Sequence, residues 1–138
     1  MIQNITFHHV GIFVNDIQLG FKYLQNLIPI HESSEIFDDK NLRVSVQFFA
    51  DESGLLFELV APYLPNNPVD NVLRNGKNIL NHIAYKTKCF DKTLLWYREN
   101  GCFIIGEPKA ALAFKQARVA FVLTKLNLII ELIEDRST

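Results

Sequence analysis

The pattern of apolar and polar residues predicts a strand, a helix and further strands in the first half of the chain. A strand is expected at residues 6–14, where apolar positions dominate. Asn15-Asp16 follows as a possible N-cap, and the apolar residues after it have the spacing of an amphipathic helix that ends near Pro29. The polar stretch 31–41 is expected to contain a short strand or a loop.

A β-hairpin is predicted next. Residues 43–50 alternate, with Val44, Val46 and Phe48 on one face and Ser45, Gln47 and Phe49 on the other. The sequence from Asp51 to Gly54 has the composition of a turn, and residues 55–60 return as a strand. The Pro- and Asn-rich residues 61–67 then indicate a linker, after which Pro68 can open a short helix.

The second half of the chain repeats this order. A strand is expected at 81–87, and a helix capped by Asp91 follows it. Three further strands are expected at 102–105, 118–123 and 128–133. The fold class is therefore α+β, with two tandem βαβββ modules in one domain over residues 1–138. The modules span about 5–62 and 79–135, and a linker helix at about 63–78 joins them.

A shift of 73 positions superimposes the two halves. It places His9 on His82 and Glu58 on Glu131. Their neighbours agree, since HVGI lies over HIAY and LLFELV over LIIELI. No net insertion separates the halves, so the pattern indicates a duplication.

The repeated residues predict a metal centre. Related modules would place one His and one Glu each at equivalent positions of a shared cleft. Two imidazoles and two carboxylates suit a first-row divalent metal. Glu58 and Glu131 lie in apolar strands, where an uncompensated carboxylate costs several kcal/mol, and one cation would serve both. For any single His or Glu of this kind, a hydrogen-bonded structural role is the common alternative; the register of all four favours the metal.

Composition and charge exclude other classes. The chain of 138 residues is 49% hydrophobic, which is enough for a real core. A net charge of -1 with dispersed acids and bases gives no footprint for nucleic acid or for an anionic membrane. Cys89 and Cys102 form neither a CxxC pair nor a disulfide framework. Neither a signal peptide nor a spanning segment is apparent, so a cytoplasmic protein is expected.

Several segments resemble the vicinal oxygen chelate superfamily, which includes glyoxalase I, bleomycin-resistance proteins, ring-cleaving dioxygenases and methylmalonyl-CoA epimerase. The segment HHVGIFVNDI, the stretch from Glu58 to Tyr85, GCFIIGEPK and RVAFV are most similar to the epimerase branch. The resemblance implies a glyoxalase-like curved sheet around a metal cleft and assigns the ligands to His9, Glu58, His82 and Glu131. It also implies proton abstraction beside a metal-polarised carbonyl of a small acyl thioester, with Glu131 and Glu58 as catalytic groups.

The resemblance is incomplete at the substrate end. Epimerases of this type can carry a second acid on the strand before the first metal glutamate, where this chain has Gln47 as the nearest polar residue. The usual glycine-rich loop before RVAFV is replaced by residues 109–116. A glyoxalase I-like lyase and a non-catalytic bleomycin-resistance-like binding protein therefore stay open as alternatives.

Strand alternation also predicts which residues line the substrate cleft. Arg118 is a candidate for binding a substrate carboxylate, with a surface ion pair as the alternative. The predicted substrate-binding residues are Ser45, Gln47, Phe49, Arg118, Phe13 and Lys86. The donor set leaves Co, Ni, Zn and Mn open as the metal. A homodimer is expected because relatives commonly dimerise and sheet edges invite pairing.

Overall fold

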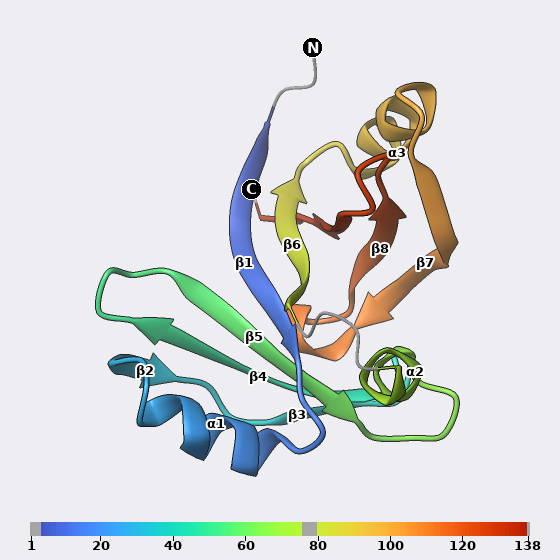
Figure 1. The fold of residues 1–138 in the computed structure, drawn as a ribbon. Coiled ribbons are helices and arrows are strands. Elements are labelled where there is room, and N and C mark those ends of the chain that lie inside the picture. The colour runs from blue at the N-terminus through green and yellow to red at the C-terminus, as the bar shows by residue number, and fades with distance from the viewer. Residues whose placement is uncertain (1–3, 76–79, 138) are drawn as a thin grey trace. The chain divides into compact units, whose positions relative to one another are not determined.

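The computed structural model describes residues 4–75 and 80–137. In these ranges the chain forms nine strands, three α-helices and one short 3-10 turn (Figure 1). It separates into two compact units, His9–Asn81 and Met1–His8 with His82–Thr138. Strand β1 contributes its first residues to one unit and the rest to the other. The expected α+β class is confirmed, and the single-domain organisation stays a prediction.

The first module begins with a strand and a helix, as expected. Its elements are β1 (Ile5–Phe13), α1 (Ile17–Gln25), β2 (Ile30–Ser33), β3 (Phe37–Asp39), β4 (Val44–Asp51) and β5 (Leu56–Pro62). The side chain of Asp16 accepts a hydrogen bond from Leu19 N at 2.9 Å, which confirms the predicted N-cap of α1. The polar stretch 31–41 contributes to two short strands, β2 and β3, which pair with opposite ends of β4.

The β4–β5 hairpin has its turn where the sequence predicted it. Asp51 Oδ1 accepts hydrogen bonds from Ser53 N and Leu55 N, and Gly54 takes a positive φ of 90°. The strand order in this unit is β2-β4-β5-β1, and β1 is parallel to β5. Helix α1 packs on β4 and β5 through a core of Ile17, Phe49, Leu59 and Ala61.

Helix α2 (Pro68–Arg74) follows, with Pro68 in its first turn, as predicted. Asn67 caps it by accepting hydrogen bonds from Val69 N and Asp70 N. The expected linker helix ran to residue 78, and the start of the second module was set at 79. Residues 76–79 lie outside the described ranges.

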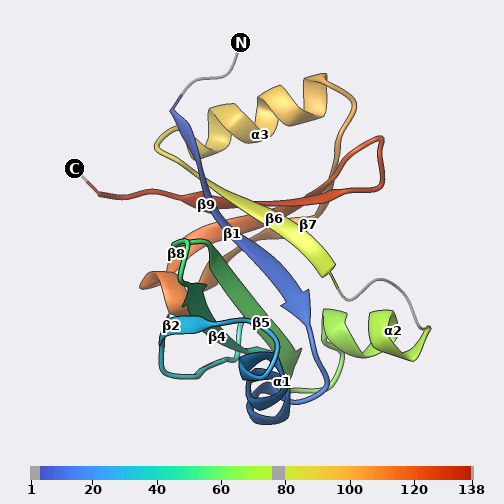
Figure 2. The ribbon, with the colours of Figure 1, turned by 60° about the vertical axis from the view of Figure 1, so that its left-hand side comes forward.

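The second module has the predicted βαβββ order. Its elements are β6 (Leu80–Thr87), α3 (Phe90–Glu99), β7 (Phe103–Ala111), the 3-10 turn Leu112–Phe114, β8 (Ala117–Leu123) and β9 (Ile129–Glu134). Within its unit the strands follow the order β1-β6-β9-β8-β7, with β6 parallel to β9. Figure 2 shows α3 lying over one face of these strands. It packs there on Ala120, Val122 and Leu132.

Two details of the second module differ from expectation. Helix α3 begins at Phe90 after Cys89, so Asp91 lies inside the first turn and is not the cap. Strand β7 is longer than residues 102–105 because it resumes its pairing with β8 after a register shift between Ile105 and Lys109. No helix in the described part of the chain is long and apolar enough to cross a membrane.

Candidate metal centre

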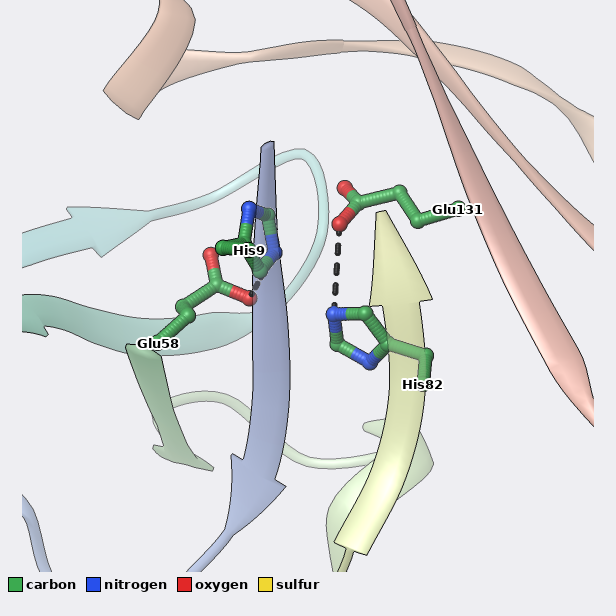
Figure 3. Close-up of side chains that lie close together, drawn as sticks. All are labelled: His9, Glu58, His82 and Glu131. Carbon is green, nitrogen blue, oxygen red and sulfur yellow. Dashed lines mark ion pairs between the residues drawn. The ribbon is translucent and has the colours of Figure 1, made fainter. Parts of the chain in front are cut away.

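The first module buries a histidine–glutamate pair on two parallel strands. Gly11 of β1 lies in register with Glu58 of β5, so His9, two residues earlier, shares the face of Glu58. His9 Nε2 lies 3.3 Å from Glu58 Oε1 (Figure 3). The two residues are 0% and 5% exposed. Gly11 has no side chain to occupy the space beside the carboxylate.

The second module builds the same pair by the same means. Ala84 of β6 lies in register with Glu131 of β9, and His82 precedes Ala84 by two residues. His82 Nε2 lies 3.2 Å from Glu131 Oε1, and both residues are buried (Figure 3). Each half therefore uses a first strand for the His, a parallel last strand for the Glu, and a small residue beside the Glu. The duplication seen in the sequence extends to the local geometry.

A phenylalanine lies beside each pair. The ring of Phe48 meets the imidazole of His9 edge to face, with centroids 5.3 Å apart and an interplanar angle of 78°. Phe121 meets His82 in the same way at 5.8 Å and 82°. These residues were not among the predicted site residues. A signal was present, since the shift of 73 superimposes Phe48 on Phe121.

The chemistry of the donors fits a divalent metal. The described residues that could hold such an ion are His9, Glu58, His82 and Glu131, all buried and each offering one ligand atom. Imidazole nitrogen and carboxylate oxygen are common ligands of Zn, Ni, Co and Mn. Within each pair the imidazole Nε2 and a carboxylate oxygen face one another, as two ligands of one ion would.

The prediction that Ser45, Gln47 and Phe49 of β4 face the cleft was wrong. Phe48, and not Gln47 or Phe49, lies opposite Glu58 in the β4–β5 ladder. Ser45, Gln47 and Phe49 therefore share the other face, with the residues that pack against α1. Phe49 is 1% exposed and stacks on Phe57 at 5.1 Å.

The polar residues of that face bond to neighbouring strands. Ser45 Oγ donates to Asp38 Oδ1 at 2.6 Å. Gln47 Nε2 donates to the carbonyl oxygen of Ser34 at 2.9 Å. Both side chains thus join β4 to the segment that contains β2 and β3.

Arg118 also lies on the face turned away from the glutamate of its module. Phe121 is opposite Glu131 in the β8–β9 ladder, so Arg118 points to the side of α3. Its guanidinium donates to both carboxylate oxygens of Asp91 and to Glu134, and lies 4.5 Å from the centre of the Phe90 ring. Hydrogen bonds from Arg118 are the main cause that lowers the pKa of Asp91 and of Glu134 below their ordinary values. The surface ion pair considered as the alternative is the arrangement that the structure contains.

The last two predicted substrate residues lie on the expected faces of their strands. Phe13 is in register with Val60 and shares the face of Glu58, where it is 5% exposed. Lys86 is in register with Ile133 and shares the face of Glu131. Their contact with a substrate stays a prediction.

Comparison with solved structures identifies the fold. A hypothetical protein from Bacillus halodurans C-125 matches with a TM-score of 0.73 and 20% identity, over 99% of this chain and 98% of that chain. Methylmalonyl-CoA epimerase from Mycobacterium tuberculosis matches with a TM-score of 0.77 and 18% identity, over 96% and 89%. A variant of the Streptomyces coelicolor epimerase in complex with 2-nitronate-propionyl-CoA gives 0.74 and 18%, over 97% of each chain. At these identities the likeness establishes the fold alone.

Comparison by sequence identifies the family. No curated protein matched this sequence. The family described as the Glyoxalase/Bleomycin resistance protein/Dioxygenase superfamily matches residues 8–121, which is most of the chain. The repeated strand order and the repeated His–Glu pair agree with the resemblance drawn from the sequence. The chain therefore belongs to the glyoxalase/bleomycin resistance protein/dioxygenase superfamily.

Proposed function

We propose that this protein is a metal-dependent epimerase that moves the proton next to the carbonyl of a small acyl thioester. The observation that carries the proposal is the buried His–Glu pair that occurs once in each module. The fold adds support, because methylmalonyl-CoA epimerases are among the solved structures that share it.

In this proposal His9, Glu58, His82 and Glu131 hold one divalent cation. Two ionised carboxylates beside two neutral imidazoles carry a charge of -2, which one divalent ion neutralises. Without such compensation two buried carboxylates would cost several kcal/mol. When bound, a divalent cation supplies Lewis-acid polarisation of a carbonyl oxygen, which acidifies the neighbouring C–H group.

The glutamates are the groups that we assign to proton transfer. Oε1 of Glu131 faces His82, so we assign the proton to the other oxygen, Oε2. Epimerisation requires return of a proton to the opposite face of the carbon. Glu58 occupies the equivalent position in the other module and is assigned to that return. Because it starts ionised, Glu58 first takes a proton from solvent, and Glu131 afterwards releases to solvent the proton that it removed. General acid–base transfer of this kind typically contributes about 10²–10⁴-fold to the rate.

The proposed substrate class is an acyl-CoA, and methylmalonyl-CoA is the first compound to test. One solved relative is a methylmalonyl-CoA epimerase in complex with methylmalonyl-CoA, and another holds 2-nitronate-propionyl-CoA. Apolar side chains share the faces of the ligands: Phe48 and Phe13 in one unit, Phe121 in the other. An apolar wall with few polar groups is the usual lining of a small-molecule site.

The test combines metal analysis with hydrogen exchange. Wild-type protein, purified without chelator, is expected to contain about one metal ion per chain and to exchange the α-hydrogen of methylmalonyl-CoA in D₂O, followed by NMR. Glu131→Gln should lose both properties. Glu134→Gln is the matched control on the same strand, because Glu134 bonds to Arg118 and takes no part in the site.

Two outcomes would contradict the proposal. Wild-type protein that holds no metal even in excess cation would exclude a metal-dependent enzyme and favour a binding protein. Conversion of the methylglyoxal–glutathione adduct, with no α-exchange on acyl-CoA substrates, would assign the chain to the glyoxalase I type of lyase.

A further inference from the structure

We infer that Phe48 and Phe121 are positioning residues that hold the imidazoles of His9 and His82 in the orientation needed for metal binding. The inference rests on the proposed metal site and adds two residues outside the ligand set. Each ring contacts the histidine of its own module, so the two contacts are separate from one another.

The rings meet the imidazoles in matching geometry. Centroid distances of 5.3 and 5.8 Å and interplanar angles of 78° and 82° are those of edge-to-face aromatic pairs. Strand register adds a second relation, because Phe48 lies opposite Glu58 and Phe121 lies opposite Glu131. Each ring is therefore next to both members of its His–Glu pair.

The two halves of the chain keep this phenylalanine, although most of its neighbours on the strand differ. At positions related by the shift of 73, the face turned to the helices has changed in all three places: Ser45 to Arg118, Gln47 to Ala120 and Phe49 to Val122. On the face of the glutamates, Val44 corresponds to Ala117 and Ala50 to Leu123, whereas Val46 is kept as Val119 and Phe48 as Phe121. The aromatic ring is thus retained at the position that contacts the ligand histidine.

The physical role follows from the freedom of an imidazole. A histidine side chain turns readily about its last bond, and a metal binds only when the correct nitrogen points at it. A phenyl ring packed edge to face with the imidazole restricts that rotation. In both pairs Nε2 is turned to the carboxylate. Residues that orient metal ligands by hydrogen bonds typically change affinity by about 10–100-fold when replaced, and we expect a ring that orients the ligand by packing to act at the lower end of that range.

The experiment measures Co²⁺ binding by Phe48→Leu and Phe121→Leu. Each variant is expected to bind Co²⁺ about 10-fold more weakly than wild type in competition with a chelating dye. The visible absorption of the bound Co²⁺, which depends on coordination geometry, should also change. Phe48→Tyr and Phe121→Tyr keep the ring and should restore both the affinity and the spectrum.

The chain offers a matched control in Phe114→Leu. Phe114 meets His8 edge to face at 5.5 Å and 82°, but His8 is not a ligand. This substitution removes the same kind of aromatic contact and should leave the affinity for Co²⁺ unchanged. Phe48→Met and Phe121→Met preserve apolar volume without the ring, and they replace the Leu variants if those fail to fold.

The outcomes separate this inference from the proposed function. Absence of Co²⁺ binding by wild type would overturn the metal site and the inference with it. Wild-type affinity and spectrum in folded Leu or Met variants would overturn the inference alone. Thermal unfolding of the metal-free proteins shows which variants are folded.

Discussion

Replacing Arg118 with methionine tests whether this residue stabilises the fold or binds substrate. The guanidinium donates to Asp91 and Glu134 and lies over the Phe90 ring at 4.5 Å. Methionine retains an apolar chain of similar length but removes the charge and every donor. We therefore expect the variant to be less stable and to keep its affinity for metal.

The magnitude follows from the exposure of each partner. Asp91 is exposed to solvent, so its ion pair with Arg118 is screened and is not counted in the expected loss of stability. Glu134, whose side chain is 22% exposed, contributes roughly 0.5–1 kcal/mol, since even a partly buried pair is only modestly stabilising. The cation–π contact with Phe90 adds about 0.5–1 kcal/mol. The free energy of unfolding should fall by about 1–2 kcal/mol at neutral pH.

The pH dependence gives a second check. Hydrogen bonds from Arg118 lower the pKa of Glu134 below the ordinary 4.5. The stability that this pair supplies is therefore complete above 4.5 and is lost as the pH falls through the lowered pKa. The difference in stability between wild type and Arg118→Met should narrow on acidification.

Urea unfolding provides the assay, with fluorescence of the single tryptophan, Trp96 on α3, as the probe. Arg98→Met, an exposed arginine on the same helix, is the control and should leave the midpoint unchanged. Unchanged stability of Arg118→Met together with a raised KM for substrate would refute this reasoning and restore the substrate-binding role.

Other substitutions test the core, the buried polar groups and the metal. Leu59→Ala and Leu132→Ala, equivalent positions that are both 0% exposed, should each lower the free energy of unfolding by about 2–5 kcal/mol in urea. Thr93→Val removes buried hydrogen bonds to Thr87 and to the Cys89 carbonyl and should cost about 1–2 kcal/mol in the same assay. Burial raises the pKa of Tyr97 to about 12, so ultraviolet titration should show a late-titrating tyrosine that Tyr97→Phe abolishes. A divalent cation at 100 times its Kd should raise the free energy of unfolding of wild type by about 2.7 kcal/mol, and a chelator should reverse this. A smaller stabilisation in calorimetry would contradict the proposed site.

The sequence alone was sufficient for most of the order of elements, though not for the two short strands β2 and β3, and it singled out the four residues that form the His–Glu pairs. The order of elements depended on local signals that tertiary structure did not override, such as the Asp16 cap and the Asp51–Gly54 turn. The His–Glu residues depended on the repeat at a shift of 73. The repeat was informative about the site because it brought out His9 with His82 and Glu58 with Glu131. A polar residue that recurs at the same position of two apolar strands points to a shared role, whereas a single one does not.

The cleft face of β4 could not be predicted because both of its faces carry large apolar side chains. The register of the β4–β5 hairpin determines which face lies on the side of Glu58, because it places Phe48 and not Gln47 opposite this glutamate. One residue more or less in that register would reverse the two faces. The same limit applies to β8, where Arg118 was a candidate for binding a substrate carboxylate in the cleft and lies on the side of α3. The same uncertainty over the strand faces explains why Phe48 and Phe121 were not among the predicted site residues.

The parallel pairing of the first and last strands in each half also has a consequence for folding kinetics. His9 and Glu58 are 49 residues apart in the sequence, as are His82 and Glu131. A helix and an antiparallel hairpin, both built from short-range contacts, lie between the members of each pair. Contacts between distant residues carry a larger loop-closure entropy and form late in slow-folding topologies. The local elements are thus expected to form before the ligand pairs, so a nascent chain offers a cation only isolated ligands until each half has closed.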